Sequence, residues 1–338
     1  ANEKESLSLE DILKTIPKLK IANINFVIFS GGEPLLRKDI FEIAQCMKDN
    51  KIMTYLSTNG TYITEKNAKK IIDTFNYIGI SIDGIGEVHD YFRGQKGSYD
   101  KSIEAIKTIQ KLGGNAGIRF TITKETESSF YDIFTLAEEL NVNKIYISHL
   151  VYSGRGKENL EIDISKEKRR EYVNFMINKA FEYYENGKDI DIVTGNMEMD
   201  AIILLKEFEK KYPDFVNSLK NRLKSWGGNS AGKRLGNMDW NGFVKPDPFF
   251  PMTIGTYLEK DFDKIWLDDS SELLEKLREF PRNIKGKCSS CKYLDICNGG
   301  SRSRAYAISG DLWDEDPSCY LTLEEIKEIG RASCRERV

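Results

Sequence analysis

Short apolar runs alternate with longer amphipathic stretches through the first half of the chain. Runs rich in β-branched and aromatic residues predict strands within 26–29, 53–60, 77–84, 116–123 and 144–150. Apolar residues at helical spacing predict helices within 40–48, 64–75, 98–114 and 130–140. This alternation predicts a parallel sheet with covering helices, either doubly wound or barrel-like. In both architectures ligands bind at the carboxyl ends of the strands.

Helix starts are marked by two predicted capping boxes. Ser8 and Asp11 precede an apolar stripe at helical spacing, and Asp39 with Glu42 precedes the helix that begins at Ile40. The turn before that second helix, FSGGEPLLRKD at 29–39, therefore joins the end of a strand to the start of a helix.

Polar residues gather where the predicted strands end, at 30–33, 57–59, 81–83 and 149–155. In the first of these turns, Gly31 and Gly32 allow a ligand to approach the backbone closely. Glu33 supplies a negative charge for an ammonium group, and Pro34 fixes the exit of the turn. A tight turn with a solvated glutamate is the alternative interpretation of this stretch taken alone.

The pattern changes after residue 155. A helix is predicted over 166–187 and a short strand over 189–195, and Asn241-Gly242 predicts a hairpin. We divide the chain into a first domain at 1–155, a bridge at 156–230 and a second domain at 231–330. Residues 331–338 are interpreted as a non-native tail that includes Cys334.

Charge and hydropathy exclude several classes of partner. The 338 residues carry 50 basic and 53 acidic side chains, for a net charge of −3, which gives no electrostatic case for nucleic acid or an anionic membrane. No apolar run is long enough to span a bilayer. The sequence therefore predicts a soluble, cytoplasmic protein.

Four of the six cysteines follow the spacing C-x2-C-x5-C-x21-C, as Cys288, Cys291, Cys297 and Cys319. Four thiolates at such spacing are the ligands of a tetrahedral zinc ion or of an iron–sulfur cluster, and spacing alone does not choose between them. Small and basic residues beside the thiols, Gly299, Gly300, Arg302 and Arg304, favour a cluster. Cys46 lies within a helical pattern and is interpreted as a buried apolar residue.

Several motifs together resemble a known family. SGGEPLLR at 30–37 is similar to the GGEP motif of radical S-adenosylmethionine (SAM) enzymes, STNG at 57–60 and ISIDG at 80–84 resemble their next strand ends, and the C-terminal cysteines resemble an auxiliary-cluster domain of the SPASM or twitch type. The resemblance implies a partial (β/α)6 TIM-type barrel without its first strand and cluster loop, followed by a small cysteine-rich α+β domain. It also implies a cofactor site made by Gly31, Gly32, Glu33, Pro34, Asn59, Ser81, Asp83 and Arg93.

The family's C-x3-C-x2-C loop, which holds the cofactor-cleaving [4Fe-4S] cluster, does not occur in the chain. Because the stretch SLEDILKTI at 8–16 resembles the helix that follows this loop, we expect the missing cysteines just upstream of Ala1. The chain is interpreted as an N-terminally truncated copy that is inactive by itself.

Within the family, SHLVYSGRGK, WGGNSAG, GFVKPDPFF and GDLWDEDPSCYLTLEEI are similar to tetrapyrrole-tailoring enzymes of the NirJ and AhbC type. That branch removes carboxylated side chains from didecarboxysiroheme in heme or heme d1 biosynthesis. Asp247 occupies the VKP turn where a cysteine is expected, so we predict one auxiliary [4Fe-4S] cluster. The resemblance also implies an electron donor of the flavodoxin or ferredoxin type.

A polyanionic ring needs basic donors around an apolar slot. The candidates for substrate binding are Arg155, His149, Lys245, Arg302 and Arg304, with Lys157 nearby. For His149 the structural interpretation is the more common one for a lone histidine at a strand end, and each cation is open to that of a solvated surface charge.

Two other functions stay open at this point. The first is a SPASM-type enzyme that modifies a peptide, and the second is a non-catalytic α/β binding protein with a zinc ribbon.

Overall fold

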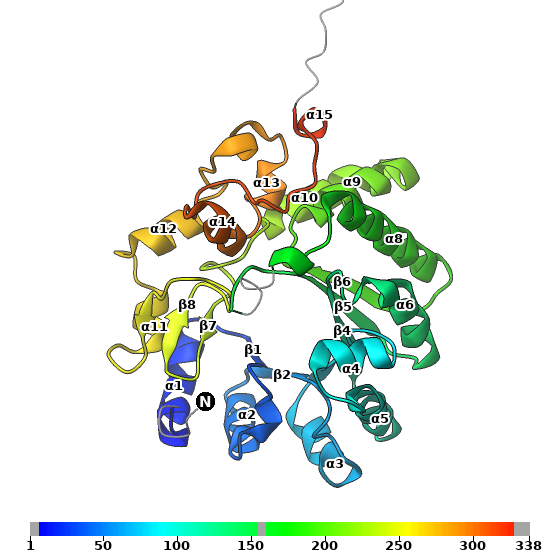
Figure 1. Ribbon diagram of the computed structural model, residues 1–338. Helices are drawn as coiled ribbons and strands as arrows, with labels where there is room; N and C mark the ends of the chain where they lie inside the picture. Colours follow the sequence, from blue (N-terminus) through cyan, green and yellow to red (C-terminus); the bar gives the residue numbers. More distant parts are fainter. Residues whose placement is uncertain (1–6, 155–159, 328–338) are drawn as a thin grey trace, which may run out of the picture.

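Six parallel strands form a curved half-barrel whose neighbours follow the order of the chain. The computed structural model describes residues 7–154 and 160–327. The sheet runs in the order β1-β2-β3-β4-β5-β6 (Figure 1). The strands are β1 (Phe26–Phe29), β2 (Met53–Thr58), β3 (Tyr77–Ser81), β4 (Ala116–Ile122), β5 (Lys144–His149) and β6 (Asp191–Gly195). The predicted partial barrel is therefore confirmed, and its sheet continues into β6.

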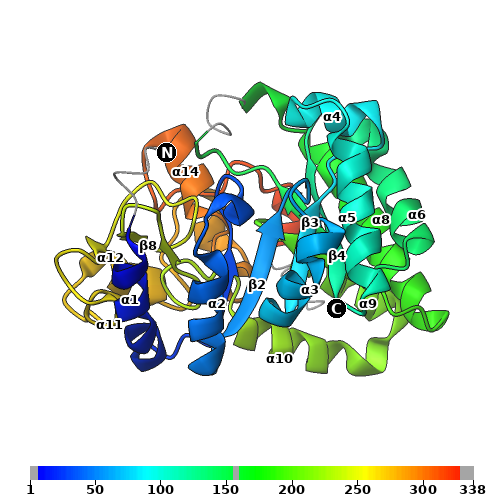
Figure 2. The ribbon, with the colours of Figure 1, turned by 90° about the horizontal axis from the view of Figure 1, so that it is seen from below.

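Helices cover the outer face of this sheet, as Figure 1 shows, and Figure 2 shows the strand and helix units following one another across the molecule. They are α1 (Leu9–Ile21), α2 (Ile40–Asp49), α3 (Glu65–Thr74), α4 (Glu87–Arg93), α5 (Ser98–Lys111), α6 (Phe130–Glu139) and α8 (Lys166–Glu185). Two further helices, α9 (Asp200–Lys211) and α10 (Val216–Trp226), follow β6. None of the helices in the described ranges has the length and apolar character needed to cross a bilayer.

The main core lies between the outer face of the sheet and these helices. Ile78, Ile80, Ile118 and Ile147 are completely buried there, and each contributes about 1.5–3 kcal/mol to the stability of the fold. Because side chains alternate along a strand, the neighbouring positions point to the inner face of the half-barrel. The inner face therefore carries a separate set of residues.

On that inner face, large polar side chains occupy space that glycines on the same or adjacent strands leave open. A β-carbon at Gly117 would lie 2.2 Å from the hydroxyl oxygen of Tyr77, and one at Gly195 would lie 1.8 Å from that of Tyr146. A β-carbon at Gly79 would likewise lie 2.7 Å from Cδ of Arg119. We call these the inner-face glycines; without them the three large side chains would not fit.

The two predicted capping boxes have different outcomes. At the start of α1, the hydroxyl of Ser8 accepts from Asp11 N and the carboxylate of Asp11 accepts from Ser8 N, so this prediction is confirmed. The prediction at Asp39 is wrong, because its side chain makes no cap and instead pairs with Arg37 at 2.6 Å. The ion pair with the Arg37 guanidinium takes the place of the cap hydrogen bond.

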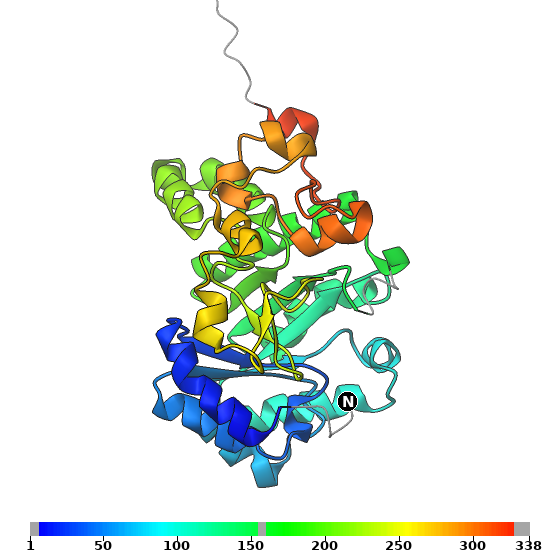
Figure 3. The ribbon, with the colours of Figure 1, turned by 90° about the vertical axis from the view of Figure 1, so that its left-hand side faces the viewer.

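The C-terminal part forms a second unit that lies across the open side of the half-barrel (Figure 3). A three-stranded antiparallel sheet, β7 (Asn237–Met238), β8 (Phe243–Lys245) and β9 (Gly255–Thr256), confirms the hairpin predicted at Asn241-Gly242. The helices are α11 (Phe262–Trp266), α12 (Glu272–Arg278), α13 (Leu294–Cys297), α14 (Arg302–Ser309) and α15 (Leu323–Ile326). Short 3-10 turns are η1 (Pro34–Leu36), η2 (Glu127–Ser129), η3 (Leu160–Ile162), η4 (Pro213–Phe215) and η5 (Gly286–Ser290).

Substituting Gly117→Ala should destabilise the protein by about 1–3 kcal/mol, because the added β-carbon overlaps the Tyr77 hydroxyl in a packed interior. Urea denaturation measures this cost. In a Tyr77→Phe background, which lacks that oxygen, the cost should shrink. Gly32→Ala is the control, because its β-carbon meets nothing within 4 Å. Equal stability of Gly117→Ala and the unaltered protein would contradict the packing described here.

Candidate functional site

A cavity of about 260 Å³ opens at the carboxyl ends of the strands. Its wall combines the predicted strand-end turns with inner-face residues of β4 and β5 and with Phe249 of the second unit. The lining residues are Ser30, Gly31, Gly32, Ser57, Thr58, Asn59, Ser81, Arg93, Arg119, Phe120, Thr121, Tyr146, Ser148 and Phe249. This is the edge at which ligands bind in parallel α/β folds.

Glu33 fastens the end of β1 to the end of β2. Its carboxylate accepts hydrogen bonds from Thr58 Oγ1 at 2.7 Å, from Asn59 N at 2.9 Å and from Leu35 N at 3.1 Å. The carboxylate is therefore already bound by three donors of the protein. Glu33 therefore holds the wall of the cavity in shape, and its predicted role as a partner for an ammonium group stays a prediction.

Asp83 fastens β3 to β4 in the same way. One carboxylate oxygen accepts from Thr121 N at 2.7 Å, and the other pairs with Arg93. The backbone N of Asp83 donates to Nδ1 of buried His89 at 3.0 Å. Since Asp83 is fully buried, it supports the cavity from behind.

The structure thus separates the predicted cofactor residues into two groups. Gly31, Gly32, Asn59, Ser81 and Arg93 line the cavity, whereas Glu33, Pro34 and Asp83 do not. Gly31 has φ of 138°, which disfavours any side chain, and a β-carbon at Gly31 or Gly32 would meet nothing within 4 Å. The glycine turn therefore leaves its backbone open to a ligand.

Sequence reasoning missed the part of the wall that lies deeper in the half-barrel. Arg119, Thr121, Tyr146 and Ser148 stand on β4 and β5 at alternate positions, so they share the inner face. The guanidinium of Arg119 lies over the ring of Tyr146, 4.3 Å from its centroid. Their alternation with buried isoleucines was a signal that could have assigned them to the inner face.

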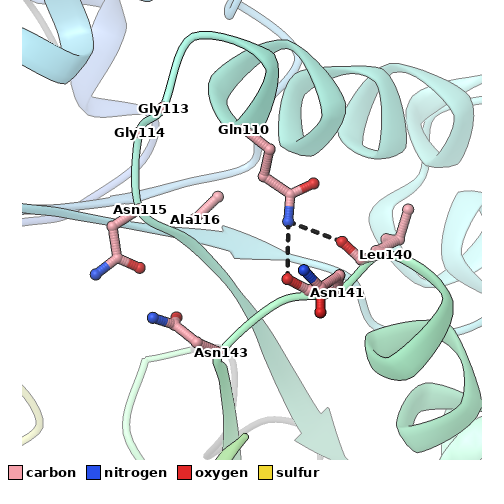
Figure 4. A pocket seen from close by; sticks show the side chains of 8 residues that line it. All are labelled: Gln110, Gly113, Gly114, Asn115, Ala116, Leu140, Asn141 and Asn143. Atoms are coloured by element: carbon pink, nitrogen blue, oxygen red, sulfur yellow. Dashed lines mark hydrogen bonds between the residues drawn. The ribbon is translucent and has the colours of Figure 1, made fainter. Parts of the chain in front are cut away.

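A larger cavity of about 540 Å³ lies at the opposite edge of the sheet, in the loops that precede β4 and β5 (Figure 4). The Gln110 side chain crosses it and donates to the backbone oxygens of Leu140 and Asn141 at 2.8 and 3.2 Å. Apart from Leu140, its other lining residues are small or amidic, and no charged residue lines it. This cavity lies at the amino ends of the strands, the face of such folds that serves stability rather than ligand binding.

The four predicted metal ligands lie near one another in the second unit, and none forms a disulfide. Burial, together with the nearby Cys319 and Cys291, raises the pKa of the Cys288 thiol to about 12. Burial and Cys319 also raise the pKa of Cys297 and Cys291. No three His, Cys, Asp or Glu side chains in the described part converge on a single ion. Buried thiols that disfavour one another's ionisation are suited to a cationic centre that would hold them as thiolates.

Two buried polar groups of the same C-terminal segment also lack partners. The side-chain amide nitrogen of Asn298 and the hydroxyl of Ser303 are buried and make no hydrogen bond within the described residues. The preceding motif WGGNSAG lies directly against Cys297, because a β-carbon at Gly228 would lie 2.2 Å from Cys297 O. Hydrogen-bond donors without a protein partner are suited to bind the sulfur atoms of a cluster, which accept hydrogen bonds.

Both arginines of α14 that were predicted to bind substrate form hydrogen bonds within the protein. Arg302 is fully buried, and its guanidinium donates to the backbone oxygens of Gly299, Gly300, Leu312 and Asp314. Arg304 is also fully buried, and its guanidinium binds both carboxylate oxygens of Asp316 at 2.8 and 3.0 Å. Burial and these protein acceptors disfavour their predicted role as substrate donors, which stays a prediction.

His149 is likewise buried and has partners within the protein. It follows Ser148 on β5, so its ring points to the outer face and has no exposed surface. Its Nε2 lies 3.1 Å from Asp200, and its Nδ1 lies 3.2 Å from Arg169. Lys245 lies on β8 and does not line the cavity, with its amine 3.9 Å from Asp239. Arg155 and Lys157 lie outside the described residues.

Replacing Glu33 by alanine should lower the free energy of unfolding by about 1–3 kcal/mol, because two part-buried amides and one hydroxyl lose their acceptor. Hydrogen exchange at the Asn59 amide should accelerate at the same time. Glu42→Ala, at an exposed position of α2, is the matched control. Unchanged protection of Asn59 would refute the fastening role of Glu33.

Anaerobic reconstitution with iron and sulfide should load about four iron atoms and four sulfides per chain if the four thiols hold a [4Fe-4S] cluster. Cys291→Ala should lose most of this load, and Cys46→Ala, in α2, should keep it. Iron and acid-labile sulfide assays give the result. Stoichiometric zinc without sulfide would instead identify a zinc ribbon.

Comparisons with known proteins agree with this geometry. The model of the family described as the radical SAM superfamily matches residues 2–137. The chain is 37% identical over 327 residues to pre-heme d1 synthase of Dinoroseobacter shibae, covering 96% of this chain and 80% of the relative. It is 36% identical over 328 residues to Fe-coproporphyrin III synthase of Methanosarcina barkeri, covering 96% and 82%.

Among solved structures, Streptococcus suis SuiB bound to S-adenosylmethionine has a similar fold. The TM-score is 0.71 at 19% identity, covering 94% of this chain and 70% of SuiB. A matching family model and two relatives at 37% and 36% identity, matched over 80% and 82% of their length, lead to one conclusion: the chain belongs to the radical SAM superfamily.

Proposed function

We propose that the protein acts in tetrapyrrole biosynthesis as a radical SAM enzyme that removes carboxylated side chains from a siroheme-derived ring. The observation that carries this proposal is the similarity to pre-heme d1 synthase and Fe-coproporphyrin III synthase across 96% of the chain. When bound, S-adenosylmethionine and its [4Fe-4S] cluster supply hydrogen abstraction from the substrate. The chain's own residues bind, orient and shield the reactants.

For the cofactor we propose the part of the cavity beside the glycine turn. The open backbone of Gly31 and Gly32 would bind the methionyl amine, and Ser81 and Asn59 offer hydrogen-bonding groups on the adjacent strands. The chain contains no C-x3-C-x2-C triplet, so we assign none of its residues to the cofactor-cleaving cluster.

For the ring we propose the inner face next to β1 and β2, where apolar side chains stay exposed. Phe26, Ile28 and Met53 are 44%, 46% and 44% exposed, although each lies on a strand of the main sheet. Phe26 also stacks on Tyr55 at 5.6 Å between ring centroids. An exposed apolar and aromatic surface inside a concave fold suits a flat macrocycle.

We propose that Cys288, Cys291, Cys297 and Cys319 hold one auxiliary [4Fe-4S] cluster. Mutual proximity of buried thiols and the unused donors of Asn298 and Ser303 support this assignment. A protein of the flavodoxin or ferredoxin type is the proposed electron donor.

A peptide substrate is the second candidate, because PqqA peptide cyclase of Bradyrhizobium diazoefficiens is also similar to the chain. Its identity is 23% over 327 residues, well below that of the tetrapyrrole enzymes. This difference favours the tetrapyrrole.

Anaerobic titration with didecarboxysiroheme should change the absorption spectrum of the ring saturably, at about one ring per chain. Joined to a C-x3-C-x2-C loop and supplied with reductant and S-adenosylmethionine, the protein should release 5'-deoxyadenosine and shorten the ring's side chains, as mass spectrometry would detect. Bovine serum albumin is the control for nonspecific ring binding. No saturable binding would reject the tetrapyrrole proposal.

A further inference from the structure

The charges that line the cavity are not balanced. Among the described residues, the charged side chains in the lining are Arg93 and Arg119. Arg93 pairs with Asp83, and Glu33 behind the wall already accepts three hydrogen bonds from the protein. Arg119 has no salt bridge with any acidic residue in the described ranges. A half-buried guanidinium without a counter-ion favours a ligand that brings a negative charge.

The surroundings of Arg119 hold its guanidinium in place. The stem passes over Gly79, where a β-carbon would lie 2.7 Å from Cδ, and the head lies over the Tyr146 ring at 4.3 Å. Burial raises the pKa of Tyr146, so this phenol stays neutral and does not act as the counter-ion. A charge that is already oriented loses little side-chain freedom when a ligand binds.

Residues with hydroxyl groups occupy neighbouring inner-face positions beside Arg119, and the cavity lining contains no acidic residue. Ser81 is the register partner of Arg119 on β3, and Thr121 and Ser148 stand one inner-face position closer to the edge. One positive charge among neutral hydrogen-bond donors is the arrangement that binds carboxylates.

We propose that Arg119 is the carboxylate-binding residue of the cavity, held by Tyr146 and by the space above Gly79. This inference rests on the proposed function and specifies its site. Two reactants carry the required group: the methionyl part of S-adenosylmethionine and the side chains of the tetrapyrrole. The same guanidinium chemistry serves either one, and a binding experiment tells them apart.

The experiment compares the reconstituted unaltered chain with its Arg119→Gln and Arg119→Lys variants. The probes are S-adenosylmethionine, decarboxylated S-adenosylmethionine and iron coproporphyrin III, each measured by equilibrium binding. Arg119→Gln should weaken binding of the relevant carboxylate probe by about 10- to 100-fold, because one charge-assisted pair is lost. Arg119→Lys should lose less, since it keeps the charge without the planar fork.

The pattern of losses identifies the source. Weaker binding of S-adenosylmethionine, with unchanged binding of its decarboxylated form, assigns Arg119 to the cofactor carboxylate. Weaker binding of iron coproporphyrin III, with unchanged binding of S-adenosylmethionine, assigns it to the substrate. Arg234→Gln is the matched control, because this exposed guanidinium also lies over an aromatic ring, that of Trp226 at 4.5 Å, outside the cavity.

Unchanged binding of every probe by both Arg119 variants would overturn the inference and leave the proposed function standing. If the unaltered chain bound no didecarboxysiroheme, the proposed function would fail, and the comparison of the two sulfonium probes would still decide the role of Arg119. Circular dichroism and the thermal midpoint check folding. If Arg119→Gln did not fold, Arg119→Lys would carry the comparison.

Discussion

The inner face of the half-barrel has room for large polar side chains only where glycines face them. A residue with a β-carbon at position 117 or 195 would overlap a tyrosine hydroxyl, and at position 79 it would overlap the stem of Arg119. Because interiors are close-packed, such overlaps are not absorbed by small adjustments. The orientation of Arg119 and the part of the cavity wall that Arg119 and Tyr146 form depend on these absent side chains.

Two carboxylates hold the ends of neighbouring strands together around the cavity. Glu33 joins β1 to β2, and Asp83 joins β3 to β4 while it pairs with Arg93. Both accept backbone N–H groups that would otherwise be unsatisfied at the end of a strand. The negative charge of the wall is therefore used within the protein, and the cavity itself is left with a positive balance.

Much of this could be predicted from sequence, because periodicity and turn chemistry are local. Strand order, the glycine turn and the hairpin at Asn241-Gly242 each depend on a few neighbouring residues. The failures depended on how loops and strands fold onto one another, which local sequence patterns do not show. Arg302 and Arg304 looked like free donors until the fold supplied acceptors from later loops, and Arg119 looked like an ordinary strand residue until the curvature turned it inward.

The fourth cysteine belongs to a segment that is tied to the half-barrel on both sides. Ser318 lies 3.0 Å from the hydroxyl of Tyr152, and the Tyr320 hydroxyl donates to Asp200 at 2.7 Å. A centre bound through Cys319 can form only when this segment is seated, so binding of the centre and docking of the two units share one free energy. Binding of iron would therefore stabilise the interface between the half-barrel and the second unit, and removal of the iron would weaken that interface.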